Sequence, residues 1–425
     1  MNIFDQLLAD NQIPKFVRVR HEMDHSHIDD IEGAVAQAMR REGTLDRIKP
    51  GDSVCITAGS RDVANIARII RAICDQVKSV GAHPFIIPAM GSHAGAKAEG
   101  QRGIIEGYGV TEEAMGAPIR ASMDTEVIAP SRSGLEIHLD KFANAADFLI
   151  PVGRIKAHTD FRGEVESGIC KMLVIGMGKQ HGAYQCHKLG FKSMAANVKE
   201  FAGAIIEKKP NMFAIGLIEN AYHQTCRIEA IPAGRILAEE PPLLEYAKSR
   251  MAKVPFDQAD ILFVDETGKD ISGAGMDPNV TGRSPVLGIS RPFFQRIAVF
   301  DLTDKSHGNF GGLGSADVTT QRLYRKIDFE QTYPNGITAA EPLAVRLPAV
   351  MPSDRTAMQF ALRTATDCDW EKGPRIVWLK NTLSLSEFYI SEALIPDAEA
   401  LDNVTIVSEP MEVIFDEEGN VKELR

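Results

Sequence analysis

The sequence lacks the features that would place the chain in a membrane or in a class with clustered cysteines. None of the apolar runs among its 425 residues approaches the roughly 20 residues needed to span a bilayer. Residues 1–16 lack a basic segment followed by an apolar one, so we expect no signal peptide. The six cysteines are scattered without a C-x-x-C pair, which argues against a clustered zinc or iron–sulfur site. Scattered thiols fit a reducing compartment, and we therefore expect a cytoplasmic protein.

Basic charge and several well-known motifs are also scarce. A formal charge of −11 disfavours nucleic acid or an anionic membrane as the main partner. An anionic substrate would therefore need arginine or lysine placed locally. The chain has no Walker motif, no G-x-S-x-G elbow, and no dinucleotide fingerprint between a strand and a helix. These absences disfavour P-loop chemistry, dinucleotide binding and acyl transfer by a serine nucleophile.

The order of strands and helices predicts an α/β fold in two domains. Strands expected at 54–58, 84–90 and 146–152 alternate with segments of helical periodicity, which indicates βαβ units and mainly parallel sheets. Residues 238–257 contain two proline-bearing runs and are expected to form a linker, after which a new α/β pattern starts. We therefore predict an N-terminal domain over 1–255, a C-terminal domain over 256–425, and a cleft between them that holds the site.

The stretch over residues 153–190 concentrates the chemistry. It follows an apolar strand and holds three of the eleven histidines (His158, His181 and His187) together with Lys156, Lys171 and Lys179. Histidine changes charge near neutral pH, and its neutral imidazole is the commonest metal ligand. We predict a metal or cofactor site here, with His181 and His187 as competing ligands.

Further candidate residues follow other strands of the predicted sheet. Arg61 follows the strand at 54–58, His93 follows the strand at 84–90, and His158 follows the strand at 146–152. Sites in open parallel sheets form beyond the carboxyl ends of the strands, so we expect these three residues to share one crevice. Two histidines placed in this way suit acid–base work on opposite faces of a small substrate. His307, in a glycine-rich loop, is a candidate in the second domain.

Taken together, these motifs resemble a known enzyme family. Their order and spacing are similar to those of the nickel-pincer-nucleotide-dependent lactate racemases, which epimerise 2-hydroxy acids. The matching pieces are Gly59-Ser60-Arg61, Gly91-Ser92-His93, the run from Gly153 to His158, the run from Ser167 to Lys171, and His187.

The resemblance implies a cofactor and a role for each matched residue. The cofactor is a pyridinium-3,5-bisthiocarboxylic acid mononucleotide that grips nickel, and His187 would complete the nickel site. Lys171 would bind the cofactor, if need be covalently, and Ser60 and Arg61 would contact it, with Arg61 also able to orient the substrate. His93 and His158 would be the paired acid–base residues. Proteins of cofactor biosynthesis are implied as partners, and a small 2-hydroxy acid as the substrate.

The chemistry explains why such a cofactor is needed. The Cα–H of a 2-hydroxy carboxylate is too weak an acid for histidine, whereas removal as hydride is easier when a base takes the hydroxyl proton. In the second domain, Thr281, Gly282 and Arg283 stand where the lactate enzyme carries other substrate contacts. The planar fork of Arg283 would suit a larger substrate or one with a second carboxylate.

Two other functions remain open from the residues alone. One is a hydrolase or lyase that uses a His-bound zinc or manganese ion. The other is a non-catalytic protein that holds the nucleotide cofactor. Metal analysis and the absorbance of the pincer would separate the first from a racemase, and turnover would separate the second.

Overall fold

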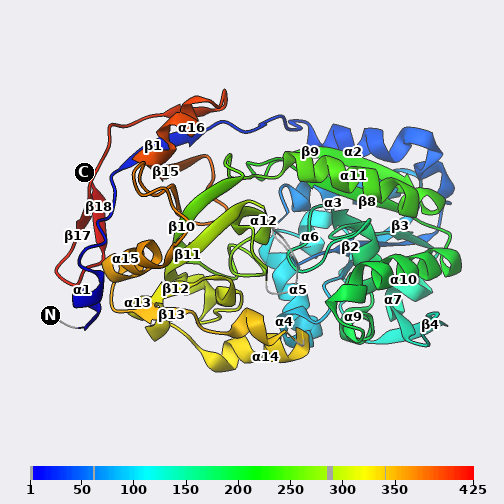
Figure 1. Ribbon diagram of the computed structural model, residues 1–425. Coiled ribbons are helices and arrows are strands. Elements are labelled where there is room, and N and C mark those ends of the chain that lie inside the picture. Colours follow the sequence, from blue (N-terminus) through cyan, green and yellow to red (C-terminus); the bar gives the residue numbers. More distant parts are fainter. Residues whose placement is uncertain (1–2, 61–62, 285–290, 340) are drawn as a thin grey trace. The chain divides into compact units, whose positions relative to one another are not determined.

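The computed structural model describes residues 3–60, 63–284, 291–339 and 341–425, and its fold is α/β (Figure 1). It divides into an N-terminal unit, residues 24–251, and a C-terminal unit, residues 1–23 with 252–425. The N-terminal unit ends at residue 251, close to the expected boundary at residue 255. The first 23 residues differ from the expectation, because their strand β1 (Phe16–His21) pairs with strands of the C-terminal unit.

The N-terminal unit is built on short parallel strands. One sheet has the order β3-β2-β6, and all its pairs are parallel, with bounds β3 (His83–Pro88), β2 (Ser53–Ala58) and β6 (Phe148–Ile150). A second sheet has the order β7-β8-β9, with bounds β7 (Val152–Arg154), β8 (Phe213–Glu219) and β9 (Thr225–Pro232). A hairpin joins β4 (Thr125–Pro130) and β5 (Glu136–Asp140).

Both faces of the β3-β2-β6 sheet are buried, as is usual for parallel sheets. Cys55 and Leu149 belong to one hydrophobic cluster, whereas their neighbours Ile56 and Ile150 belong to the other. The helices of this unit are α2 (Ile31–Arg40), α3 (Ile66–Ser79), α4 (His93–Ala96), α5 (Ala98–Gly107), α6 (Glu112–Met115), α7 (Lys141–Ala145), α8 (Ile169–Lys171), α9 (Lys179–His187), α10 (Met194–Lys208) and α11 (Ile236–Arg250).

Helix α11 corrects the prediction of a linker over residues 238–257. Pro241 and Pro242 lie inside this helix, although proline removes backbone hydrogen bonds. Tertiary packing overrides that penalty, because Leu243, Leu244 and Ala247 are buried and α11 packs against α8, β8 and β9. The linker prediction was wrong because the sequence shows proline but not these contacts.

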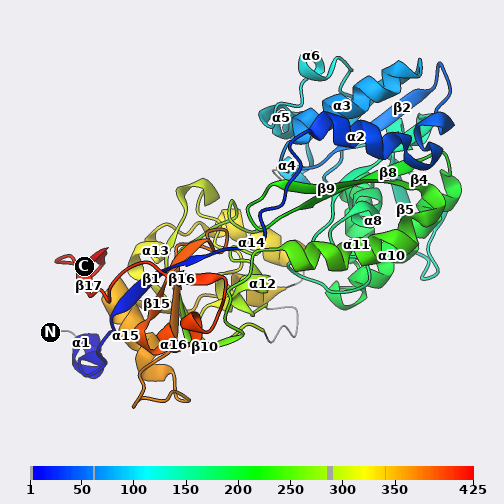
Figure 2. The same ribbon diagram turned by 90° about the horizontal axis from the view of Figure 1, so that it is seen from above.

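The C-terminal unit contains an eight-stranded mixed sheet with the order β13-β12-β11-β10-β14-β15-β1-β16. Its first five members in that order are parallel, and β15, β1 and β16 are antiparallel to their neighbours. Strand β1 lies beside β15 and β16 (Figure 2). The strand bounds are β10 (Gln258–Thr267), β11 (Phe293–Leu302), β12 (Val318–Thr320), β13 (Ala349–Met351), β14 (Ile376–Leu379), β15 (Glu387–Ser391) and β16 (Val404–Ile406). The hairpin of β17 (Val413–Phe415) and β18 (Val421–Leu424) follows.

Six helices accompany the sheet and hairpin of the C-terminal unit in the part of the chain that the structure describes. They are α1 (Ile3–Leu8), α12 (Pro278–Thr281), α13 (Gln321–Arg325), α14 (Phe329–Ala339), α15 (Asp354–Thr364) and α16 (Ile395–Glu399). Across the described ranges of both units, we find no helix with the length and apolar character that a membrane crossing requires.

A buried ion pair holds α9 against the strands of the N-terminal unit. The side chains of Lys179 and Asp140 are both fully buried, and their Nζ and Oδ2 atoms lie 3.2 Å apart. Lys179 Nζ also donates to the Pro88 carbonyl at the end of β3. Asp140 ends β5 and accepts hydrogen bonds from the first amides of α7. One ammonium group therefore joins α9, β5 and β3.

We predict that Lys179→Met strongly destabilises the N-terminal unit. The substitution leaves the Asp140 carboxylate buried without its cation, a change that typically costs about 3–5 kcal/mol. Thermal unfolding followed by circular dichroism should show a clearly lowered transition. Lys141→Met is the matched control, because it removes an exposed pair with Asp124 and should cost less than about 1 kcal/mol. Equal effects of the two substitutions would contradict the prediction.

The C-terminal unit contains a carboxyl group that titrates near neutral pH. Burial raises the pKa of Asp265 to about 7, although the Trp378 indole, which donates to its Oδ1 at 2.6 Å, opposes the shift. The folded chain thus holds a proton that the unfolded chain releases near pH 4. Stability from this group is complete below about pH 4 and is lost as the pH rises to about 7.

We predict that Asp265→Asn flattens this pH dependence. The asparagine oxygen can accept the same indole hydrogen bond but does not titrate. The midpoint of thermal unfolding should therefore fall less between pH 6 and pH 8.5 in Asp265→Asn than in the parent protein. Asp304→Asn, at an exposed carboxylate, should keep the parent slope. An unchanged slope in Asp265→Asn would show that Asp265 is already ionised at pH 6.

Candidate active site

His158 and Lys171 meet at the end of β7. The chain leaves β7 in a loop over 155–168 and enters α8, so that His158 lies near the loop's start and Lys171 at the end of α8. His158 Nε2 lies 2.6 Å from Lys171 Nζ. The two residues that the sequence places thirteen positions apart are thus in direct contact.

The hydrogen bonds of His158 fix the orientation of its ring. The Asp160 amide donates to His158 Nδ1 at 2.9 Å, so Nδ1 serves as an acceptor. The ring of Phe161 packs against it with 4.2 Å between centroids. Because Nδ1 accepts, the proton of the neutral ring is on Nε2, the nitrogen that faces Lys171 Nζ.

Burial and positive charge keep His158 neutral. Desolvation is the largest cause that lowers the pKa of His158 well below its usual range, and the nearby charges of Lys171, Lys156 and Arg162 lower it further. A neutral imidazole at pH 7 can accept a proton, as a general base must.

His187, at the end of α9, has the arrangement of a metal ligand. Its Nδ1 lies 2.6 Å from the Ala183 carbonyl oxygen, which can only accept, so Nδ1 carries the proton. The lone pair is then on Nε2, the usual arrangement when the other ring nitrogen of a ligating histidine donates to a carbonyl. Desolvation lowers the pKa of His187, and the charge of Lys171 acts in the same direction, which favours the neutral donor.

His181 lies on the same helix in different surroundings. Its exposed ring stacks on that of His138 in β5, with centroids 5.6 Å apart. His187, by contrast, interacts electrostatically with both His158 and Lys171. Of the two competing ligands, the structure favours His187.

His93 and Ser60 form a second contact at the ends of β3 and β2. Ser60 Oγ lies 2.5 Å from His93 Nδ1, and His93 is exposed. Tyr108 donates to the Ser60 carbonyl at 2.8 Å and thereby holds the loop. Arg61 lies outside the described residues.

Glycines bring these loops close to the segment that carries Lys171. A Cβ on Gly59 would lie 3.3 Å from Met172 Cε, and one on Gly91 would lie 3.2 Å from Ile175 Cγ2. Met172–Gly176 (η3) forms one turn of π-helix directly after Lys171, a feature that recurs at functional sites. The loops of Ser60 and His93 therefore border the segment that continues from Lys171.

Arg283 and His307 lie in the C-terminal unit. The Arg283 guanidinium contacts Asp317 Oδ2 at 2.5 Å and donates to the carbonyls of Phe294 and Gln295. Residues of the same chain therefore already bind the guanidinium that was expected to bind a substrate carboxylate. His307 is exposed and ends a short 3₁₀ turn in a left-handed conformation.

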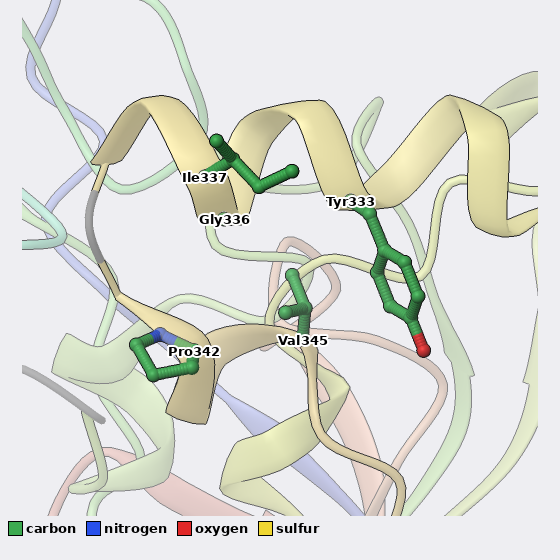
Figure 3. Close-up of a pocket in the computed structure, with 5 residues that line it drawn as sticks. All are labelled: Tyr333, Gly336, Ile337, Pro342 and Val345. Carbon is green, nitrogen blue, oxygen red and sulfur yellow. The ribbon is translucent and has the colours of Figure 1, made fainter.

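The C-terminal unit also has an apolar hollow with a volume of about 400 Å³ (Figure 3). Tyr333, Gly336 and Ile337 of α14 line it from one side, and Pro342 and Val345 from the other. It contains none of the candidate residues.

Three side chains around the site were not identified from the sequence. Glu166 accepts the His158 amide, Glu240 of α11 accepts the Cys170 amide in α8, and Lys248 of α11 pairs with Glu166. In the sequence, Glu166 and Glu240 stand close to apolar residues, but that pattern does not show which residues they contact. Among the described residues, no three His, Cys, Asp or Glu side chains form a group that could hold a metal ion.

Comparison with known proteins shows a likeness in fold to a solved structure. No family model and no curated protein matches the chain. Among solved structures, the lactate racemase apoprotein from Thermoanaerobacterium thermosaccharolyticum superimposes with a TM-score of 0.52 at 16% sequence identity. The match covers 86% of this chain and 94% of that chain. The chain is therefore similar in fold to lactate racemase over most of the length of both proteins.

Proposed function

We propose that the protein is a racemase or epimerase of a 2-hydroxy carboxylic acid that works with a nickel-pincer nucleotide. The observation that carries the proposal is the cluster of His158, Lys171 and His187, in which His187 presents Nε2 as a neutral donor. The likeness in fold to lactate racemase and the order of the matched motifs support it.

The residues of the cluster fit the cofactor. His187 Nε2 would hold the nickel that the cofactor carries, because it offers a neutral imidazole donor. Lys171 offers an amine beside it, and Ser60 and Arg61 would contact the nucleotide. When bound, the nucleotide supplies the acceptor for the substrate's Cα hydrogen with its electron pair.

The chain's own residues handle the hydroxyl proton. For one enantiomer, His158 takes this proton, and a planar 2-oxo acid forms when the Cα hydrogen leaves. For the other enantiomer, His93 takes the proton, because the hydroxyl group then faces the opposite side. For the first enantiomer, a protonated His93 gives its proton to the product while His158 keeps the proton that it took, and the reverse direction exchanges these two states. Exchange with solvent then restores the starting protonation of both histidines.

The deciding experiment is a panel of single-enantiomer 2-hydroxy acids incubated with cofactor-loaded protein and analysed by chiral chromatography. We expect inversion of at least one acid, and His93→Ala and His158→Ala should each slow both directions by about 10²–10⁴-fold. His83→Ala, at an exposed histidine at the start of β3, is the matched control and should keep the parent rate. A complete lack of inversion across the panel would refute the racemase, and parental rates in either site variant would remove that histidine from the mechanism.

We predict that His187→Ala loses nickel while the fold survives. The substitution removes the imidazole donor but leaves the buried contacts of α9 in place. Metal content after cofactor loading should fall to background in His187→Ala, with an unchanged circular dichroism spectrum. His181→Ala serves as the control and should retain nickel. Full retention of nickel by His187→Ala would transfer the ligand role to another residue.

A further inference from the structure

Glu166 is a fully buried carboxylate that the proposed chemistry does not use. It lies in the loop between His158 and Lys171, and its side chain has no exposed surface. Its Oε2 accepts the His158 main-chain amide at 2.7 Å, and Arg162 Nη1 lies 3.4 Å from the same oxygen. Lys248 Nζ lies 3.0 Å from the other oxygen, Oε1.

A buried carboxylate of this kind contributes little net stability to the fold. Removing a charge from water is costly, and replacing a buried ion pair with apolar side chains is often neutral or stabilising. Buried charges of this kind are better explained where they impose one geometry on their neighbours. The neighbour that Glu166 contacts directly is His158.

A series of contacts runs from Glu166 to the ring of His158. The carboxylate holds the backbone of His158, and the Asp160 amide, two residues on, then meets the ring at Nδ1. With Nδ1 engaged and Phe161 packed against the ring, Nε2 is directed at Lys171 Nζ. A shift of the His158 backbone would disturb each of these contacts.

Helix α11 supports both ends of the loop. Lys248, near the C-terminal end of the helix, pairs with Glu166. Glu240, nearer the start of the same helix, accepts a hydrogen bond from the Cys170 amide at 2.8 Å. Gly168 makes room for the second contact, because a Cβ there would lie 2.0 Å from Glu240 Oε1. The same helix thus supports the segment of His158 and the segment of Lys171.

We propose that Glu166 is a positioning residue that holds His158 in one tautomer and one orientation, with Lys248 as its supporting cation. The proposal rests on the proposed function only for the role of His158 as an acid–base residue. The orientation itself is a property of the protein without cofactor.

The test follows the His158 ring in the apoprotein by nitrogen-15 NMR of labelled histidine, with the signal assigned by its loss in His158→Gln. In the parent protein we expect one neutral tautomer, with Nδ1 unprotonated. Glu166→Ala should give a mixture of both tautomers, whereas Glu166→Gln should keep one, because its amide oxygen can accept the His158 amide. Should Glu166→Ala not fold, Glu166→Met fills the buried space and is interpreted in the same way.

Glu245→Gln is the matched control. Glu245 is an exposed carboxylate that pairs with the same Lys248 at 2.9 Å, and its loss should leave the His158 signal unchanged. A single parental tautomer in Glu166→Ala would overturn the proposal. So would equal mixing in Glu166→Gln and Glu166→Ala, because the hydrogen bond to His158 would then not be the cause.

Kinetics with the loaded enzyme give an independent readout. Glu166→Ala should lower kcat about tenfold to a hundredfold with KM changed less than about threefold, the pattern of a displaced catalytic group. Glu166→Gln should recover most of kcat. A failure of the hydroxy-acid panel would remove this kinetic readout but not the NMR result, so the two proposals can fail separately.

Discussion

The buried pair of Lys179 and Asp140 is the constraint on which the arrangement of the site depends. Its ammonium group binds the carbonyl that ends β3, and the loop with His93 begins shortly after that strand. The same lysine starts α9, and His187 ends it. Lys179 adopts a left-handed backbone conformation, with φ of 54°, that non-glycine residues rarely take. One desolvated contact thus fixes the origin of two segments that carry candidate residues.

The site concentrates positive charge within an acidic protein. The chain has a net charge of −11, yet Lys156, Arg162 and Lys171 all act on the pKa of His158. A local cluster of this kind attracts a carboxylate that the general field of the protein repels. It also keeps the imidazoles neutral, which suits both a proton acceptor and a metal donor. The electrostatics of this cluster therefore favour neutral imidazoles and, under the proposed function, would also attract the substrate carboxylate.

Local patterns in the sequence predicted local structure well. The apolar runs located β2 and β3 closely, because each strand is buried along almost its whole length. The α/β fold class is confirmed. Ser60 and His93 follow the ends of β2 and β3 and are in contact, as is usual for residues at the carboxyl ends of neighbouring parallel strands. The contact of His158 with Lys171 depends on the path of the loop over 155–168, which hydrophobic periodicity does not predict.

Contacts between distant residues were beyond the sequence patterns. Glu240 reaches α8 across seventy positions, and Lys248 reaches Glu166 from the same helix, so neither has a local signature. The two prolines of α11 pointed to a break where packing holds a helix. Arg283 stood in a loop rich in small residues, and its partners on β11 and directly before β12 became visible only with the sheet in place.

The place of β1 has a consequence for how the chain is made. This strand lies between β15 and β16, whose residues come more than 360 positions later. During vectorial synthesis it leaves the ribosome well before both of its partner strands and must wait, with its hydrogen-bonding edges open, until they have followed. The unit of residues 24–251 is continuous and can form meanwhile. Closing so long a loop is slow, so the open edges of β1 can pair wrongly for a long part of synthesis.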